Sequence, residues 1–196
     1  MSEDFVQWMI QKGHFDGALW SDYVATNASD PAAGCLEVLR FYTGIEDATI
    51  RQHVSTFWQE AGSRAWIQSV VDAISWLDDL GFDVFVVSGT PRIVLDPLPR
   101  HLPVLPDRIL ALELEVDADG RFTGRHSGVP TYGEGKAQRL RDAGCAGVFL
   151  AAGNSGLDVE MLRLSQDIKW AIQPDHALRR TALDEGWVIT DIGAQP

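Results

Sequence analysis

The chain has 196 residues, of which 45% are hydrophobic and 22% are charged, and this balance is typical of a folded globular protein. Its 16 basic and 28 acidic side chains give a formal net charge of −12. A nucleic-acid-binding surface needs clustered lysine and arginine, so this composition argues against one. No apolar run approaches the roughly 18 residues of a membrane span. The length suits one ordinary domain, or a domain plus a small insertion.

The first residues and the cysteines indicate where the protein works. The chain starts with the acidic stretch Met1–Asp4 and shows no basic segment followed by an apolar one, so we expect no secretory signal. Cys35 and Cys145 are far apart in sequence and fit no metal-binding spacing. We therefore expect a cytoplasmic protein that binds neither membranes nor nucleic acid. An anionic substrate would need a local positive site, made by lysine, arginine or a metal ion.

Residues 1–65 predict only helices. Apolar residues recur at helical spacing around Trp8 and around Tyr42, and Gly13 and Gly44 end these two segments. A third helix is expected over 46–60, with four apolar residues on one face: Ile50, Val54, Phe57 and Trp58. Three short helices with aromatic side chains make a small helical module.

From residue 66 onward, the pattern alternates between helices and strands. We expect helices over 67–80, 136–143 and 158–164, and strands over 83–87, 110–116, 121–126, 147–152, 170–172 and 187–190. The helix over 67–80 should turn Val70, Val71, Ile74 and Leu77 inward. The strands at 83–87 and 147–152 are apolar without alternation, which predicts burial on both faces. Asp117–Gly120 predicts a hairpin turn. This is an α/β, doubly wound pattern, in which ligands bind at the carboxyl ends of the strands.

Three groups of residues lie where such a fold does chemistry. Ser88-Gly89-Thr90 follows the first apolar strand, where a hydroxyl and backbone N–H groups can hold a phosphate oxygen. Lys136 stands at the start of a helix and can neutralise a phosphate. Asn154 and Asp158 lie on a loop that enters a helix, and their oxygens suit Mg²⁺. Each group also has a simpler interpretation: a helix cap, a solvated surface lysine, and a turn with a capping carboxylate.

The order of these groups is more specific than any one of them. A Ser after one strand, then a Lys, then Gly-Asn-Ser-x-x-Asp resembles motifs two, three and four of the haloacid-dehalogenase superfamily. Further stretches resemble its phosphoserine-phosphatase-like branch: 85–90, 113–124, 133–136, and 153–155 with Asp158 and Met161-Leu162. The resemblance covers residues 66–190 well, and residues 5–60 are more loosely similar to the helical cap of that branch. It implies a cap over 1–65 and a Rossmann-like parallel core over 66–196.

The resemblance implies a Mg²⁺-dependent phosphomonoesterase acting on a small phosphorylated metabolite. In this family an aspartate attacks phosphorus, and water then hydrolyses the aspartyl-phosphate. By this resemblance Ser88, Gly89 and Thr90 would bind the phosphoryl group and Lys136 would brace it. Asp158 would hold Mg²⁺ directly or through water. Asn154 stands where many members have Asp, and its carbonyl can still coordinate the metal with one negative charge fewer.

The family's first motif, a buried strand ending in Asp-x-Asp before the cap, is missing. Asp117-Ala118-Asp119 matches the residue types of this motif. However, an alternating strand precedes it, and a hairpin turn fits better. His14-Phe15-Asp16 echoes the motif, but the residues before it predict a helix. Either the sequence is truncated, which we favour, or the protein is a degenerate relative that binds a phosphorylated ligand or a partner without turnover. An unrelated doubly wound binding module is a third alternative.

The missing strand has a structural consequence. In the family it lies between the strands of motifs two and four, here the apolar strands over 83–87 and 147–152. These strands should therefore either pair directly or leave a slot between them. We expect the slot, because nothing else in the chain supplies a spare buried strand. Unpaired strand edges are templates for pairing with another chain, so self-association through the slot is expected.

Overall fold

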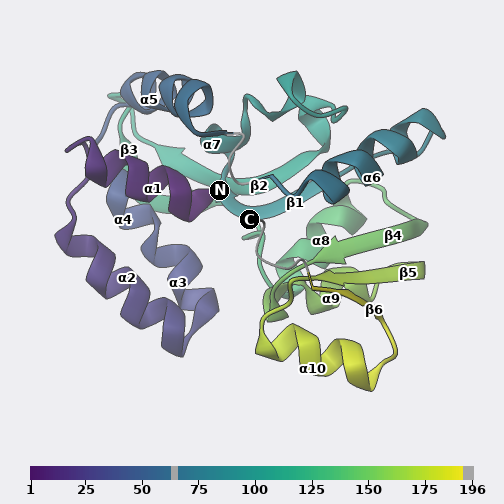
Figure 1. Ribbon diagram of the computed structural model, residues 1–196. Helices are drawn as coiled ribbons and strands as arrows, with labels where there is room; N and C mark the ends of the chain where they lie inside the picture. Colours follow the sequence, from purple (N-terminus) through teal and green to yellow (C-terminus); the bar gives the residue numbers. More distant parts are fainter. Residues whose placement is uncertain (63–65, 192–196) are drawn as a thin grey trace. The chain divides into compact units, whose positions relative to one another are not determined.

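A computed structural model describes residues 1–62 and 66–191 (Figure 1). They form two compact units, which divide between Pro130 and Thr131. The predicted cap over 1–65 and core over 66–196 divide the chain differently, by helix and strand pattern, and this division stays a prediction. Among the described residues, no helix is both long and apolar enough to cross a membrane.

Five helices open the first unit: α1 (Ser2–Gln11), α2 (Ala18–Ser29), α3 (Pro31–Glu37), α4 (Leu39–Tyr42) and α5 (Asp47–Glu60). The predicted first and third helices correspond to α1 and α5, and the four residues expected on the inner face of α5 are buried. The second predicted helix is divided between the end of α3 and α4. Helix α2 was not predicted, because Tyr23 is its only buried residue and its apolar periodicity is weak.

The helices share one hydrophobic core with the strand segments of the same unit. Phe5 of α1 and Phe57 of α5 meet edge to face, with their ring centroids 5.3 Å apart. Tyr42 packs edge-on against Phe122, the first residue of a strand, at 5.9 Å. All four side chains are buried in this cluster, so neither the helices nor the strands of this unit bury their apolar faces alone.

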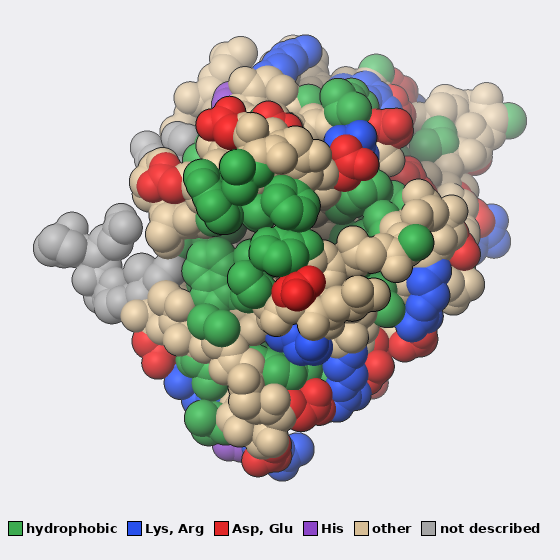
Figure 2. Space-filling model, turned by 90° about the vertical axis from the view of Figure 1, so that its right-hand side faces the viewer, with side chains coloured by type: hydrophobic (Ala, Val, Ile, Leu, Met, Phe, Trp, Pro, Cys, Tyr) green, Lys and Arg blue, Asp and Glu red, His purple; other side chains and the backbone are tan. Residues whose placement is uncertain are grey.

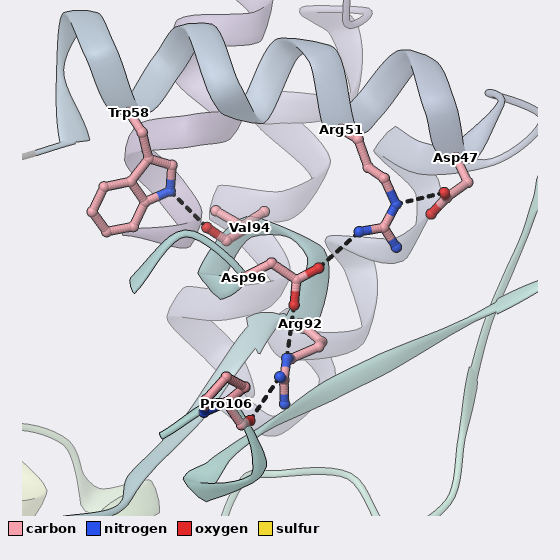
Figure 3. A network of polar contacts seen from close by, with 7 residues as sticks. All are labelled: Asp47, Arg51, Trp58, Arg92, Val94, Asp96 and Pro106. Carbon is pink, nitrogen blue, oxygen red and sulfur yellow. Dashed lines mark hydrogen bonds and ion pairs between the residues drawn. The ribbon is translucent and has the colours of Figure 1, made fainter. Parts of the chain in front are cut away.

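Polar contacts also join α5 to the short helix α7 (Arg92–Leu95), as Figure 3 shows. Trp58 donates its indole N–H to the carbonyl of Val94 at 2.8 Å, a buried bond. The carboxylate of Asp96 accepts from Arg51 at 2.8 Å and from Arg92 at 2.9 Å. The exposed ion pairs contribute little alone, whereas the buried indole bond satisfies a carbonyl that water does not reach.

The first sheet has the order β1-β2-β3, with β1 (Val86–Pro91) parallel to β2 (Ile109–Val116), and β2 antiparallel to β3 (Phe122–Ser127). The short helices at Leu98–Arg100 and Pro106–Arg108 lie between β1 and β2 along the chain. The predicted hairpin is confirmed. Within its turn, the Asp117 carboxylate accepts the backbone N–H groups of Asp119 and Arg121, and Gly120 has a φ of 76°. Such a φ favours glycine.

The predicted bounds of the first strand are wrong. The strand runs over Val86–Pro91 instead of 83–87, so Ser88, Gly89 and Thr90 lie within it and not in a turn. Ser88 pairs with Ala111, and Pro91 with the next residue, Leu112, so Gly89 and Thr90 have no partners in the ladder. Extra residues on one strand make a bulge, which allows the chain to resume pairing before α7 begins.

Helix α6 (Gln68–Asp79) is confirmed as an element, but its burial is not. The four residues predicted to turn inward are only half-buried, and no residue of this helix is fully buried. Trp76 is 59% exposed, Leu80 57% and Phe82 39%. Hydrophobic side chains are thus part of the molecular surface, and Figure 2 shows such side chains in green on one face. Periodicity finds a helix's apolar face but does not show what covers it.

The second unit holds a parallel sheet with the order β4-β5-β6. Its elements are α8 (Glu134–Asp142), β4 (Val148–Gly153), a short 3₁₀ helix (Gly156–Asp158), α9 (Val159–Leu162), β5 (Ser165–Ile172), α10 (His176–Asp184) and β6 (Val188–Thr190). Helix α9 contacts β4 and β5, and α10 contacts β5 and β6 (Figure 1). Strand β5 is longer than predicted, because its first half contains the polar residues Ser165, Gln166 and Asp167, of which the last two are exposed. Helix α10 was not predicted.

Strands β1 and β4 lie in different sheets, each at an edge, so the alternative of direct pairing between them is not observed. Residues 2–11 are helical, and no strand lies between residues 1 and 20. The prediction that both strands are fully buried is wrong. Val86 and Val87 of β1 are half-buried, and so are residues Val148–Leu150 of β4. Within the described residues, each of these strands has a neighbouring strand on one side only. The slot itself stays a prediction.

Strand β4 lies at an edge of its sheet, and its sequence, Val-Phe-Leu-Ala-Ala-Gly, lacks charge and proline, two of the features that protect edge strands from pairing. We predict that the protein self-associates with rising concentration, as measured by sedimentation velocity. Val148→Lys in β4 should prevent this, because a charged residue on an edge opposes pairing. Val188→Lys is the matched control in β6, the strand at the other edge, where Val188 is 53% exposed. A wild-type protein that stays monomeric, or equal effects of the two substitutions, would contradict the prediction.

Candidate active site

Lys136 lies in the first turn of α8, where its side chain is 12% exposed. Gly133, the residue before the helix, has a φ of 53°, a conformation that favours glycine. The ammonium group of Lys136 donates to Oδ1 of Asp158 and forms an ion pair with it. The interpretation of Lys136 as a solvated surface lysine is therefore wrong, because this lysine is largely buried and paired.

Asp158 closes the loop that follows β4, and its side chain is 4% exposed. While Oδ1 faces Lys136, Oδ2 accepts the backbone N–H groups of Asn154 at 2.9 Å and Ser155 at 3.0 Å. Gly153 precedes them, and a Cβ there would lie 2.6 Å from the Cβ of Asp158. Any other residue at position 153 would therefore displace the carboxylate.

Two further contacts fix the loop. The hydroxyl of Ser155 accepts the N–H of Leu157 at 3.2 Å, and together with Asp158 it forms a capping box at the start of the short helix. The carbonyl of Leu157 accepts the N–H of Gly133 at 3.0 Å, which ties the loop to the residue that opens α8. The loop after β4 and the start of α8 thus hold Lys136 and Asp158 together.

The donor set fits a magnesium ion only in part. Mg²⁺ prefers oxygen ligands and commonly keeps several waters beside one or two carboxylates. Asp158 is the buried carboxylate here, but each of its oxygens already accepts protein donors. Asn154 is exposed and adds a side-chain carbonyl. The described residues contain no group of three or more His, Cys, Asp or Glu side chains that could hold a metal ion. They can therefore supply part of a coordination shell, with water or a ligand's oxygens completing it.

Ser88, Gly89 and Thr90 belong to the other compact unit, so the expectation that they bind the same phosphoryl group as Lys136 stays a prediction. Ser88 and Gly89 are half-buried and Thr90 is buried. The hydroxyl of Ser88 accepts the N–H of Thr90 at 3.1 Å across the bulge. Because the bulge takes Gly89 and Thr90 out of the ladder, the backbone of this segment is shaped differently from that of a regular strand.

Both segments that echo the missing motif have structural roles. Asp117 and Asp119 form the hairpin turn described above. His14 follows α1, a helix and not a strand, and its ring lies 4.0 Å from that of His53. Burial and then the nearby His14 lower the pKa of His53. Asp16 accepts the N–H of Ala18 at the entrance to α2. The interpretation of these segments as a turn and a helix end is confirmed.

Asp175 was missed by the sequence reasoning. It precedes α10, and its carboxylate accepts the N–H groups of Leu178 and of Gly156, each at 2.8 Å. Its own N–H donates to the carbonyl of Asn154 at 2.8 Å. A signal existed in the sequence, because an Asp after Pro174 and before an apolar helical pattern predicts a helix N-cap. That signal predicts the cap but not the contact with a loop about twenty residues earlier.

Comparison with known proteins identifies the family. The family model described as haloacid dehalogenase-like hydrolase matches residues 10–163, most of the chain. The chain is 25% identical over 198 residues to the histidinol-phosphatase of Neisseria meningitidis, covering 93% of this chain and 88% of that protein. It is 30% identical over 177 residues to phosphoserine phosphatase SerB1 of Mycobacterium tuberculosis, covering 84% of this chain and 54% of that protein.

Other relatives match over a smaller part of their length. The "Inhibition of morphological differentiation protein" of Streptomyces azureus is 39% identical over 116 residues, which are 57% of this chain and 40% of that protein. The chain thus spans about half or less of two of these curated relatives. A solved structure of a substrate-bound phosphoserine phosphatase aligns with a TM-score of 0.68 and 15% identity, covering 98% of this chain and 86% of that one. At this identity, the likeness shows the α/β fold alone.

The buried ion pair predicts a specific effect on stability. Lys136→Met should lower the free energy of unfolding by about 3 kcal/mol, because it leaves the Asp158 carboxylate buried with only its two N–H donors. Lys12→Met is the matched control, since Lys12 pairs with Glu60 at 3.0 Å and both side chains are nearly half exposed. It should cost less than about 1 kcal/mol. Urea unfolding of both variants measures this, and equal losses would contradict the buried pairing.

Proposed function

Because the chain belongs to the haloacid dehalogenase-like hydrolases, we propose that it carries the magnesium-dependent phosphomonoesterase site of the phosphoserine-phosphatase-like branch. The observation that carries this proposal is the buried Lys136–Asp158 pair beside the loop that follows β4. Parallel α/β sheets bind ligands at the carboxyl ends of their strands, and this loop lies at such an end. A buried ammonium group offers a local positive charge for an anionic substrate in a chain whose net charge is −12.

The proposed substrate is a small phosphorylated metabolite. Two of the relatives described above are named as a histidinol-phosphatase and a phosphoserine phosphatase, and both names denote hydrolysis of a small phosphate ester. The Neisseria protein is matched over most of both chains, which supports the same substrate class here. The residues around Lys136 recognise charge and do not identify the alcohol that carries the phosphate.

Each residue has a proposed task. Lys136 neutralises negative charge on the phosphoryl oxygens, and Asp158 holds the lysine in place. From the resemblance to the family, Ser88, Gly89 and Thr90 are proposed to bind the phosphoryl group. Asn154 through its carbonyl, and Asp158 directly or through water, would hold Mg²⁺, which would stabilise developing charge when bound. In this reaction the phosphoryl group moves to a carboxylate, the alcohol leaves, and water then releases phosphate.

The attacking carboxylate is the part of this chemistry that we do not assign. The one Asp-x-Asp pair in the 196 residues, Asp117-Ala118-Asp119, follows an alternating strand, and the Asp117 carboxylate is engaged within its hairpin turn. We therefore propose that this chain binds a phosphorylated ligand without turning it over. Binding without turnover is also what a degenerate, non-catalytic relative would do.

The test is hydrolysis of p-nitrophenyl phosphate with Mg²⁺. The 196-residue chain should show no turnover above background. A variant extended at its N-terminus by an apolar strand ending in Asp-x-Asp should hydrolyse the ester, and Lys136→Ala or Asp158→Ala should reduce its rate at least about a hundredfold. Mg²⁺-dependent turnover by the 196-residue chain itself, lost in Asp158→Ala, would place the nucleophile within it. A folded but inactive extended variant would favour the non-catalytic function.

A further inference from the structure

We infer that Asp175 is a positioning residue for the loop 154–158, which carries the candidate metal ligands. It contacts the loop in two ways: its N–H donates to the carbonyl of Asn154, and its Oδ2 accepts the N–H of Gly156, both at 2.8 Å. Its other oxygen, Oδ1, accepts the N–H of Leu178 in the first turn of α10. One carboxylate thus joins a helix start to the loop after β4. The role of this loop in metal binding rests on the proposed function, whereas the contacts do not.

The approach of Asp175 to the loop depends on an unusual backbone turn. Gln173, the residue after β5, has a φ of 44° and is the one non-glycine residue in the described ranges with a positive φ. Its N–H donates to the carbonyl of Thr190 at the end of β6, at 2.8 Å. Such a conformation is costly for a residue with a side chain and persists where surrounding contacts enforce it. Here it directs the chain from the end of β5 back toward the end of β4.

Because the loop 154–158 packs closely against its neighbours, a shift of Asp175 would also shift the contacts of Asp158. A Cβ on Gly156 would lie 2.9 Å from the Cβ of Ala177 in α10, so the loop and the helix are in contact at this point. At the other end of the loop, Gly153 leaves no room beside Asp158. The N–H groups of Asn154 and Ser155 both point at Oδ2 of Asp158. A shift of Asn154 or Gly156 would therefore change the bonds that hold the Asp158 carboxylate.

The simpler alternative is that Asp175 only caps its helix. Asp30 shows what such a cap looks like elsewhere in the chain: a single oxygen accepts the N–H groups of Ala32 and Ala33 in α3. Asp175 differs because it divides its two oxygens between its own helix and a distant loop. A serine at this position would still cap the helix, but its single hydroxyl could not also reach Gly156. Asp175→Ser therefore separates the two roles.

The experiment is amide hydrogen exchange by NMR on Asp175→Ser. Exchange at Asn154, Ser155 and Gly156 should accelerate roughly five- to tenfold, because the loop loses a charged acceptor. Asp175→Asn, which keeps the shape and one acceptor oxygen, should show a smaller change and serves as a second variant if the serine variant folds poorly. Asp30→Ala is the matched control, since it removes a helix cap and should leave these three amides unchanged.

A second readout connects the loop to the metal. Calorimetric titration with Mg²⁺ should give an affinity about ten- to a hundredfold weaker in Asp175→Ser than in the wild-type protein, as is usual when a residue that orients a metal ligand is lost. No affinity in the wild-type protein would count against the proposed metal site, and the exchange data would still decide the role of Asp175. Unchanged exchange in Asp175→Ser, or equal acceleration in Asp30→Ala, would overturn the inference.

Discussion

The ion pair between Lys136 and Asp158 is the interaction on which the rest of the candidate site depends. A buried carboxylate is costly unless its oxygens are bonded, and here a lysine and two backbone N–H groups satisfy both oxygens of Asp158. The same bonds fix the conformation of the loop after β4 and the placement of the first turn of α8. Glycine at 153 is a consequence of this arrangement, because the backbone there approaches the carboxylate closely, and the bond from Gly133 to Leu157 ties the loop to the start of α8.

A buried ion pair does not by itself indicate function. Well-packed apolar residues often replace such pairs without loss of stability, so a pair at a strand end needs a further reason to be there. Its location supplies one, since the carboxyl ends of parallel strands are where folds of this class bind ligands. The family gives a second reason, because the hydrolase family model matches residues 10–163, which include both Lys136 and Asp158. The two lines support the same proposal without showing which ester is bound.

The sequence predicted the elements that carry strong local signals. Helices α1 and α5 have clear apolar faces, and Asp117–Gly120 has the residues of a hairpin turn, so both were predicted correctly. The bulge at Gly89 and Thr90 was not predictable, because pairing with β2 is a non-local interaction. The half-burial of α6 and β4 was not predictable either. An apolar sequence does not show whether another helix or strand covers it. Lys136 and Asp158 were identified as candidates by motif order, but their burial and direct contact emerged only from the structure.

The most direct test asks whether the pair serves a ligand or only the fold. Calorimetric titration of inorganic phosphate, in the presence of Mg²⁺, compares the wild-type protein with the double variant Lys136→Met/Asp158→Leu, in which no unpaired charge is left buried. If the pair is part of a phosphate site, the wild-type protein binds phosphate and the double variant, although folded, binds it at least about tenfold more weakly. Equal binding by the two proteins, or no binding by the wild-type protein, would contradict the account.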